Sequence, residues 1–248
     1  MKTNNIAIIF AGGIGQRLNS DKNATPKQFL KVYDKPILIY TLELFQQNEI
    51  IDKIYISIVA SHLDYMKELV EYYHLTKVAG ITVGGATGQD SIYKALKMAA
   101  QENSDDSIVL SHDGVRPNIT QEVINLNIQN AREHGTSITS TPAFETILFS
   151  EDGITPKSVP YRRQTFAAQA PQTFKLGEIV SAHEQERQTN PDYIDIIDSC
   201  TLFTKQGKPT HMIRGNFGNI KITTIEDLYV LRALITCKED MNAFGLKK

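Results

Sequence analysis

The stretch that decides the fold reads Ile6-Ala7-Ile8-Ile9-Phe10-Ala11-Gly12-Gly13-Ile14-Gly15-Gln16-Arg17. Its first five residues are apolar, which is typical of a β-strand buried on both faces of a parallel sheet. The glycines that follow allow positive φ angles and leave backbone N–H groups uncovered, and such a turn can hold the oxygens of a phosphate. The stretch therefore predicts a buried strand that ends in a phosphate-binding turn, with contacts from Ala11, Gly12, Gly13 and Gly15.

Strand-like and helix-like patterns alternate on from this strand. Isoleucine- and valine-rich runs predict strands, and apolar residues three or four apart predict helices between them. The expected strands are 6–10, 53–60, 78–83, 106–112 and 137–141, and the expected helices are 36–47, 61–73 (capped by Ser61), 91–100 and 120–133. This alternation predicts a single three-layer, Rossmann-like α/β domain over residues 1–248, with helices on both faces of a mostly parallel sheet.

The alternation stops between residues 143 and 173, where one glycine and three prolines occur without helical periodicity. A connection of this length inside a compact domain is usually functional, so we expect an arm that leaves the main sheet. Beyond it, the patterns predict a helix at 176–188, strands at 210–213 and 219–222, and a last helix from 224 to 237.

Composition narrows the class of partner. The 248 residues carry a net charge of −2 and two cysteines, neither of them in a Cys-x-x-Cys pattern. No apolar run approaches the roughly 18 residues of a membrane-spanning helix, and the first residues lack the features of a signal peptide. The balanced charge gives no sign of nucleic-acid or membrane binding. We therefore expect a cytoplasmic protein that acts on small molecules.

Two cations follow the glycine turn, Arg17 and then Lys27 in Pro26-Lys27-Gln28. The Walker A sequence and the dinucleotide-binding fingerprint are both absent. A guanidinium and an ammonium group beside a glycine turn suit a triphosphate whose charge rises during transfer. The alternative is a tight turn with two solvated cations, and the Pro-Lys-Gln segment favours the triphosphate.

Two further groups stand at predicted strand ends. Asp113 follows the strand 106–112, at the edge where open α/β sheets bind ligands, and a single carboxylate there can hold Mg²⁺. A turn-capping aspartate is the alternative. Gly84 and Gly85 follow the strand 78–83, where they allow a flat base to approach. Ser91 can bind the nucleotide or cap the helix that starts there.

Five motifs, in order, resemble the sugar-nucleotide pyrophosphorylases and cytidylyltransferases. They are Ala11-Gly-Gly-x-Gly-x-Arg17 with Pro26-Lys27-Gln28, Gly84-Gly85 with Gln89-Asp90-Ser91-Ile92, Ser111-His-Asp-Gly-Val-Arg-Pro117, Ala170-Pro-Gln-Thr-Phe174, and Asn219-Ile-Lys-Ile-Thr223. The resemblance is closest to the branch that contains 2-C-methyl-D-erythritol 4-phosphate cytidylyltransferase and ribitol-5-phosphate cytidylyltransferase. It implies the nucleotide-diphospho-sugar transferase type of fold and the transfer of CMP from CTP to a polyol phosphate, with Mg²⁺ on Asp113.

The resemblance also implies how the acceptor is held. It places Lys221 against the acceptor phosphate and Arg116 beside the acceptor. It places Thr146 and Arg162 there too, on an arm that reaches across a homodimer into the neighbouring site. A solvated Arg162, with Arg163 in its role, is the alternative.

The same resemblance implies the catalytic roles. Arg17 and Lys27 would stabilise the charge on the transferring phosphoryl group, while Lys221 and Arg162 aim the acceptor. His112 would be structural. A phosphate monoester is already mostly dianionic near pH 7, so no general base is expected.

Two departures bear on the acceptor. Thr87-Gly88-Gln89 stands where the methylerythritol branch commonly carries an arginine, and Gly114-Val115 stands where that branch prefers two alanines. Both favour a pentitol phosphate, ribitol 5-phosphate first, giving pyrophosphate and CDP-ribitol for teichoic acid or capsule synthesis. The alternatives are the methylerythritol enzyme of isoprenoid synthesis and a catalytically silent nucleotide-binding protein.

Overall fold

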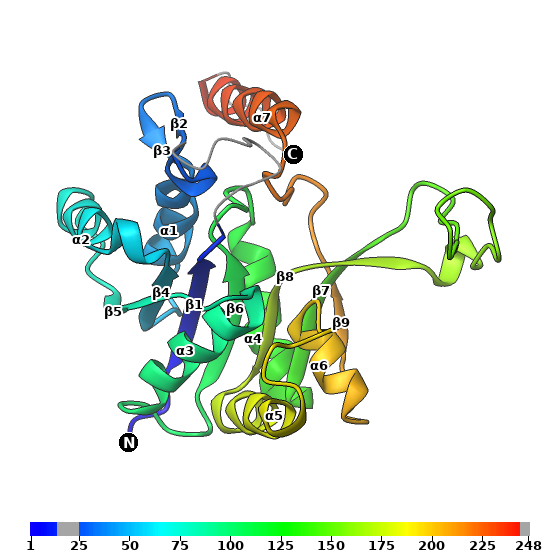
Figure 1. Ribbon diagram of the computed structural model, residues 1–248. Helices are drawn as coiled ribbons and strands as arrows, with labels where there is room; N and C mark the ends of the chain where they lie inside the picture. Colours follow the sequence, from blue (N-terminus) through cyan, green and yellow to red (C-terminus); the bar gives the residue numbers. More distant parts are fainter. Residues whose placement is uncertain (14–24, 244–248) are drawn as a thin grey trace.

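The computed structural model describes residues 1–13 and 25–243. Within these residues, seven strands form one sheet in the order β5-β4-β1-β6-β8-β7-β9, and β2 and β3 form a separate hairpin (Figure 1). The strands are β1 (Asn5–Ala11), β2 (Lys31–Val32), β3 (Lys35–Pro36), β4 (Lys53–Ile58), β5 (Val78–Val83), β6 (Ile108–Asp113), β7 (Thr136–Pro142), β8 (Phe166–Lys175) and β9 (Met212–Arg214). The α-helices are α1 (Ile37–Gln47), α2 (Leu63–Tyr72), α3 (Gly88–Ala100), α4 (Gln121–His134), α5 (Leu176–Thr189), α6 (Ser199–Lys205) and α7 (Ile225–Ala243). The 3-10 helices are η1 (Lys27–Phe29), η2 (Ala60–His62) and η3 (Arg162–Gln164).

The central strand β1 divides its side chains between two apolar layers. Ala7 and Ile9 belong to a cluster shared with α1, α2 and α4, while Ile6 and Ile8 belong to a cluster shared with α3, α5 and α6. All four side chains are fully buried, which explains why this run is apolar at every position. The predicted three-layer α/β architecture is confirmed (Figure 1).

The strand directions bring the sequence motifs to one edge of the sheet. β1 pairs in parallel with β4 and β6, and β4 pairs in parallel with β5. In this register Phe10 lies opposite Asp113. Within the seven-stranded sheet of the described residues, only β8 runs antiparallel to its neighbours β6 and β7, so this sheet is mostly parallel, as predicted. The carboxyl ends of β1, β5 and β6 therefore meet, as they do in other ligand-binding α/β sheets.

Two predicted helix starts are wrong. The helix expected from Ser91 begins at Gly88, and its N-cap is Thr87, whose hydroxyl accepts a hydrogen bond from the Asp90 backbone N–H. Ser61 does not cap α2: it lies in η2, and its hydroxyl contacts the ring of its neighbour His62.

The strand predicted at 219–222 is also wrong. This segment lies outside the described strands, and the backbone N–H of Ile222 donates to the carbonyl oxygen of Val115. The side chain of Ile222 packs in a third apolar cluster with Leu231 of α7. The alternating residues Ile220 and Ile222 thus pack in the apolar cluster that includes α7 and do not pair in a sheet.

The segment 143–173 divides into two parts. Residues 143–165, which we call the arm, project from the body of the molecule (Figure 1) and contain η3 and an isolated bridge between Phe149 and Ser158. The rest belongs to β8, which enters the main sheet: Gln172 pairs with both Ser111 and Ile138. The sequence therefore predicted the position of the arm correctly but missed β8, the strand that follows it.

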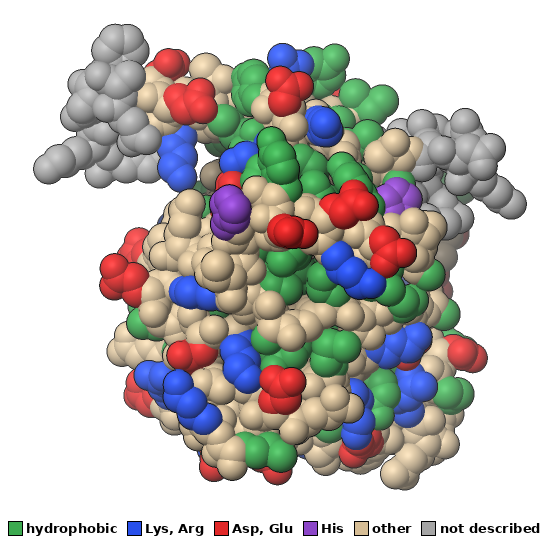
Figure 2. Space-filling view, turned by 90° about the vertical axis from the view of Figure 1, so that its left-hand side faces the viewer, with side chains coloured by type: hydrophobic (Ala, Val, Ile, Leu, Met, Phe, Trp, Pro, Cys, Tyr) green, Lys and Arg blue, Asp and Glu red, His purple; other side chains and the backbone are tan. Residues whose placement is uncertain are grey.

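The molecular surface on the side of α2 and β5 mixes charges of both signs. Figure 2 shows basic and acidic side chains interspersed over this face, with apolar side chains gathered in its upper part. No helix in the described part of the chain has the length and apolar character needed to cross a membrane.

Candidate active site

Gly12 and Gly84, which directly follow β1 and β5, are closely packed against Ser91. A Cβ atom at Gly12 would lie 2.7 Å from the Ser91 Oγ atom, and one at Gly84 would lie 2.9 Å from the same oxygen. The φ angles of Gly12 and Gly13 lie outside the left-handed region, so the described part of this turn does not use the positive φ that its glycines allow. Here glycine serves to bring β1, β5 and α3 together.

Ser91 connects these elements. Its hydroxyl donates to the Thr87 carbonyl oxygen at 2.9 Å and accepts from the Gly85 backbone N–H at 3.0 Å. The side chain is almost fully buried. In this structure Ser91 fixes the loop between β5 and α3.

Gln28 holds the segment after the turn against the end of β1. Its buried side-chain amide donates to the Ala11 carbonyl oxygen at 2.6 Å. This bond positions η1 so that Lys27 lines the same pocket as Gly12 and Gly13. Gly15 and Arg17, which the sequence assigned to the phosphate site, lie outside the described residues.

Asp113 is the electrostatic centre of the site. Its Oδ1 atom lies 2.5 Å from the Lys221 Nζ atom, and its Oδ2 atom lies 2.8 Å from the Arg116 Nε atom. Burial raises the pKa of Asp113, but the charges and hydrogen bonds of Lys221 and Arg116 outweigh it and lower the pKa to about 2. Arg116 also donates to the Asn219 carbonyl oxygen at 2.8 Å. Asp113, Lys221 and Arg116, which we call the Asp113 trio, thus form a buried carboxylate paired with two cations.

His112 stands behind this trio. Its ring is fully buried, packs against Phe45, and lies 3.1 Å from the Arg116 carbonyl oxygen. Burial lowers its pKa to about 4, so the ring is neutral near pH 7. These contacts agree with the structural role expected for it.

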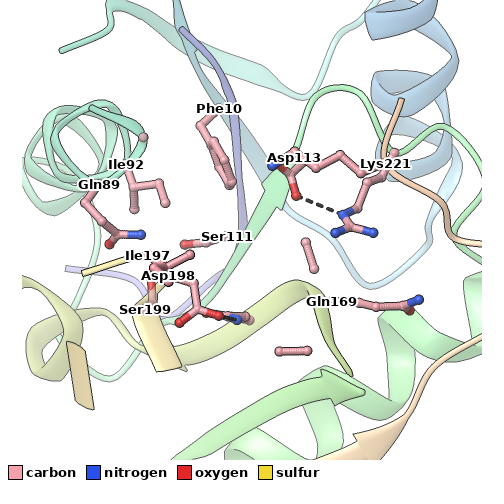
Figure 3. Close-up of a pocket in the computed structure, with 15 residues that line it drawn as sticks. Phe10, Gln89, Ile92, Ser111, Asp113, Gln169, Ile197, Asp198, Ser199 and Lys221 are labelled. Carbon is pink, nitrogen blue, oxygen red and sulfur yellow. Dashed lines mark hydrogen bonds and ion pairs between the residues drawn. The ribbon is translucent and has the colours of Figure 1, made fainter. Parts of the chain in front are cut away.

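Two pockets meet at Asp113. The first, which we call the glycine pocket, encloses about 290 Å³ and is lined by Gly12, Gly13, Lys27, Gly85 and Ser91, among others. The second, which we call the β6–β8 pocket, encloses about 240 Å³ between α3, β6, β8 and the start of α6 (Figure 3). Asp113 and Lys221 line both. The site can therefore hold two ligands side by side with a charged group of each at Asp113 and Lys221.

The arm residues lie elsewhere. Thr146 and Arg162 are exposed, and neither lines either pocket. Within one chain, the structure brings Lys27, Asp113, Arg116 and Lys221 together and leaves the two arm residues apart from them.

Sequence reasoning quoted Gln89 and Ser111 only as parts of motifs, and it missed that the inner lining of the β6–β8 pocket brings them together with Asp198 and Ser199. Gln89, Ser111, Asp198 and Ser199 contribute to it. Ser111 could have been noticed, because it is a polar residue at the end of the otherwise apolar run Ile108-Val109-Leu110. Asp198 and Ser199 belong to the start of α6, a helix that the sequence patterns did not reveal.

A metal ion would find a small donor set here. The described residues contain no group of three or more His, Cys, Asp or Glu side chains that could hold a metal. Mg²⁺ commonly takes one or two carboxylates and completes its shell with water and phosphate oxygens. Asp113 is a carboxylate at the boundary of the two pockets, and although its oxygens are paired with Lys221 and Arg116, each keeps a lone pair for an ion that arrives with a polyphosphate.

A glycine-lined strand end, a lysine beside it and a carboxylate that carries two cations define a nucleotide-binding α/β protein built for phosphorylated substrates. Residues 5–237 match the model of the IspD family, described as 2-C-methyl-D-erythritol 4-phosphate cytidylyltransferase. The chain belongs to this family of cytidylyltransferases. The predictions of a nucleotidyltransferase and of CTP as its nucleotide substrate are thereby confirmed.

Individual relatives cover nearly the whole chain. Ribitol-5-phosphate cytidylyltransferase of Streptococcus agalactiae serotype V is 43% identical over 98% of this chain and 99% of its own length. 2-C-methyl-D-erythritol 4-phosphate cytidylyltransferase of Clostridium acetobutylicum is 36% identical over 93% and 97%. The crystal structure of 4-diphosphocytidyl-2C-methyl-D-erythritol synthase from Anaerococcus prevotii superposes with a TM-score of 0.79 at 26% identity, covering 94% of this chain and 96% of that one.

Proposed function

We propose that this protein transfers CMP from CTP to ribitol 5-phosphate and releases pyrophosphate. The observation that carries the transfer is the Asp113 trio, which stands between two pockets and so brings two phosphorylated substrates to one point. The acceptor is supported by the higher identity to the streptococcal ribitol-5-phosphate enzyme than to the clostridial methylerythritol enzyme, 43% against 36%. Two departures from the methylerythritol branch support the same acceptor. Residues 87–89 lack the arginine that is common in that branch, and Gly114-Val115 replaces its two alanines.

The glycine pocket takes CTP in this proposal. Backbone N–H groups of Gly12 and Gly13 and the ammonium group of Lys27 hold the triphosphate. The roles of Gly15 and Arg17 in binding it are carried over from the sequence motif. Gly84, Gly85 and Ser91 lie beside the cytosine base of the bound CTP. Mg²⁺ held by Asp113 would neutralise the negative charge that the two substrates bring together.

The acceptor enters the β6–β8 pocket. Lys221 and Arg116 bind its phosphate, and because that phosphate is mostly dianionic near pH 7 it needs no base to become a nucleophile. Its oxygen attacks the α-phosphorus of CTP in line, the bond to the bridging oxygen breaks, and pyrophosphate leaves. The protein contributes by holding two anions at the reacting distance, which alone accounts for much of the acceleration of such reactions.

The arm serves a second subunit in this proposal. Its apolar side chains Phe144, Leu148, Phe149, Val159 and Tyr161 are each more than half exposed in one chain, as expected of a surface that another copy covers. Thr146 and Arg162 of the arm would then reach the acceptor in the partner's site. The cytoplasmic location predicted from the sequence belongs to the proposal as well.

Pyrophosphate release tests the acceptor directly. The purified protein is given CTP and Mg²⁺ with ribitol 5-phosphate, arabinitol 5-phosphate or 2-C-methyl-D-erythritol 4-phosphate, and kcat/KM is compared. We expect ribitol 5-phosphate to exceed the methylerythritol substrate by about 100-fold or more, since a binding site rejects a ligand that leaves its polar groups unpaired. A preference for the methylerythritol substrate would overturn the acceptor assignment. CTP binding without pyrophosphate release from any of the three would favour a silent nucleotide-binding protein.

A further inference from the structure

The inner end of the β6–β8 pocket holds polar atoms without partners. The Ser111 Oγ, Ser199 Oγ and Gln89 Oε1 atoms are buried and make no hydrogen bond to any described residue. Their side chains are 3%, 1% and 4% exposed, and all three residues line this pocket. Buried polar groups in native proteins are nearly always paired, so three unpaired groups around one pocket mark a place where a bound ligand or water supplies the missing hydrogen bonds.

The geometry of β6 aims one of these groups along the pocket. Ser111 and Asp113 are two residues apart on a strand, so their side chains point to the same face of the sheet, about 6–7 Å apart along the chain. Figure 3 shows the Ser111 hydroxyl and the Gln89 side-chain amide pointing toward one another, away from Asp113 and Lys221. A ligand anchored at Lys221 thus extends past Ser111 towards α3 and α6.

The charges of the pocket fix the direction of that ligand. One end carries Lys221 and Arg116, and the other end carries the Asp198 carboxylate (Figure 3). The Asp198 oxygens are already engaged, because Oδ1 accepts from the Thr201 backbone N–H at 2.7 Å and Oδ2 accepts from the Gln172 amide at 2.8 Å. Asp198 therefore orders the wall and repels a phosphate, while its Oδ2 atom, with one bond from a described residue, can still accept from a ligand hydroxyl. An anionic group binds at the Lys221 end, and an uncharged chain lies at the other.

We propose that Gln89, Ser111 and Ser199 bind the hydroxyl groups of the acceptor's polyol chain and determine its specificity. Serine hydroxyls both donate and accept, and a glutamine side chain offers both functions, so the three match a row of alcohols rather than a carboxylate, an amine or an apolar chain. This inference rests on the proposed function for the position of the phosphate, and it adds the residues that recognise the rest of the acceptor.

Steady-state kinetics of Ser111→Ala, Ser199→Ala and Gln89→Met test it. We expect each variant to raise the KM for ribitol 5-phosphate by about 5-fold or more, the effect of one lost hydrogen bond, with the KM for CTP changed by less than about twofold. sn-Glycerol 3-phosphate, which has a shorter chain, should lose less from the same variants. Ser137→Ala is the matched control, because Ser137 is also a buried serine whose hydroxyl lacks a partner among the described residues, and it lines neither pocket.

The outcomes separate this inference from the proposed function. An unchanged KM for the acceptor in all three folded variants overturns the inference, since the groups would then bind only solvent. A KM increase for CTP equal to that for the acceptor also overturns it, because the pocket would hold part of the nucleotide. If the wild-type protein uses a different polyol phosphate, the proposed acceptor is wrong, and the same KM shifts measured with that substrate still support the inference. Turnover with no polyol phosphate overturns both.

Discussion

At the scale of single residues, the site depends on how Asp113 and its two cations balance. A lone carboxylate this deeply buried would be driven towards its neutral form, whereas Lys221 and Arg116 keep it ionised. The trio carries a net positive charge, so it can receive phosphates from either pocket. Lys221 lies far from Asp113 in the sequence. The local sequence around Asp113 therefore indicated only a candidate ligand-binding residue, and the pairing with Lys221 appears only in the folded structure.

Lys27 gives the first prediction at this scale. We expect Lys27→Ala to lower kcat by about 100-fold or more, as does the loss of a donor that acts on charge developing in the transition state. Lys31→Ala is the control, because Lys31 is exposed a few residues further on and lines neither pocket. A Lys27→Ala enzyme with near-normal kcat would remove Lys27 from the proposed mechanism.

The contact between Gly12 and Ser91 gives the second. Gly12→Ala should lower the free energy of unfolding by about 1 to 3 kcal/mol, because the new methyl group meets the Ser91 hydroxyl. Ser91→Ala should cost about 1 kcal/mol for its lost hydrogen bonds. In the double variant the clash is gone, so the two costs should fall short of additivity by about 1 kcal/mol or more.

Urea denaturation measures all three variants. Gly13→Ala is the control, because a Cβ atom there meets no heavy atom of residues 1–13 and 25–243 within 4 Å. Strict additivity of Gly12→Ala and Ser91→Ala would show that the two residues do not press on each other.

At the scale of elements, the sequence revealed what local patterns encode. The helices expected at 36–47 and 120–133 are present as α1 and α4, with Pro36 and Thr120 at the N-cap positions instead of the first helical positions, because helix periodicity is a local property. It missed α6, a helix of only seven residues whose start depends on Asp198 and on the distant Gln172. It also missed the strand in β8, where alanine, glutamine and proline carry little strand preference and the pairing with β6 and β7 decides the structure.

The site residues also divide into those that local sequence patterns predict and those that only tertiary packing brings together. The glycines, Lys27 and Asp113 could be predicted because strand ends and phosphate turns have recognisable sequences. The polar lining of the β6–β8 pocket could not be predicted as a group: Ser111 stands out as a polar residue after an apolar run, but Gln89, Ser111 and Ser199 meet only after α3, β6 and α6 pack together.

The α5 helix carries a prediction on pH. His183 of α5 is fully buried, its Nδ1 atom lies 2.8 Å from the Tyr193 hydroxyl, and Tyr93 and Arg187 surround it, with Asp90 beyond them. Burial, assisted by the charge of Arg187, lowers its pKa from 6.5 to about 3. Below pH 6.5 this histidine is protonated in the unfolded chain but stays neutral in the folded protein. The free energy of unfolding therefore decreases as the pH drops from 6.5 towards 3.

The expected loss is about 1.6 kcal/mol between pH 6.5 and pH 5, because the unfolded histidine is half protonated at pH 6.5 and the slope approaches about 1.4 kcal/mol per unit of pH only below it. His183→Gln keeps a polar group beside Tyr193 and removes the titration. Urea unfolding at both pH values should therefore show a smaller pH dependence in the variant by about this amount. Equal pH dependence in the two proteins would contradict a neutral, buried His183.

At the scale of the whole molecule, the proposed site draws on two separate parts of the chain. The body supplies Lys27, Asp113, Arg116 and Lys221, while the arm, whose Thr146 and Arg162 line neither pocket, projects away from the body (Figure 1). A twofold dimer can exchange such arms, so that each site is completed by its neighbour.

Mixed dimers test this arrangement. Arg162→Ala and Lys27→Ala proteins, each weakly active alone, are mixed after reversible dissociation. We expect about a quarter of the wild-type activity to return, because half of the dimers become hybrids and each hybrid regains one intact site. Each variant taken alone through the same dissociation is the control. No recovery from hybrids that are shown to form would mean that the arm acts in its own subunit or not at all.

A crystal structure of the protein with CTP tests the central claim most directly. We expect the triphosphate to lie over Gly12 and Gly13, in contact with Lys27, with its α-phosphorus facing Asp113 and the β6–β8 pocket left open for the acceptor. A triphosphate bound at Gln89 and Ser111, or anywhere away from the end of β1, would contradict the assignment of the two pockets and the mechanism built on it.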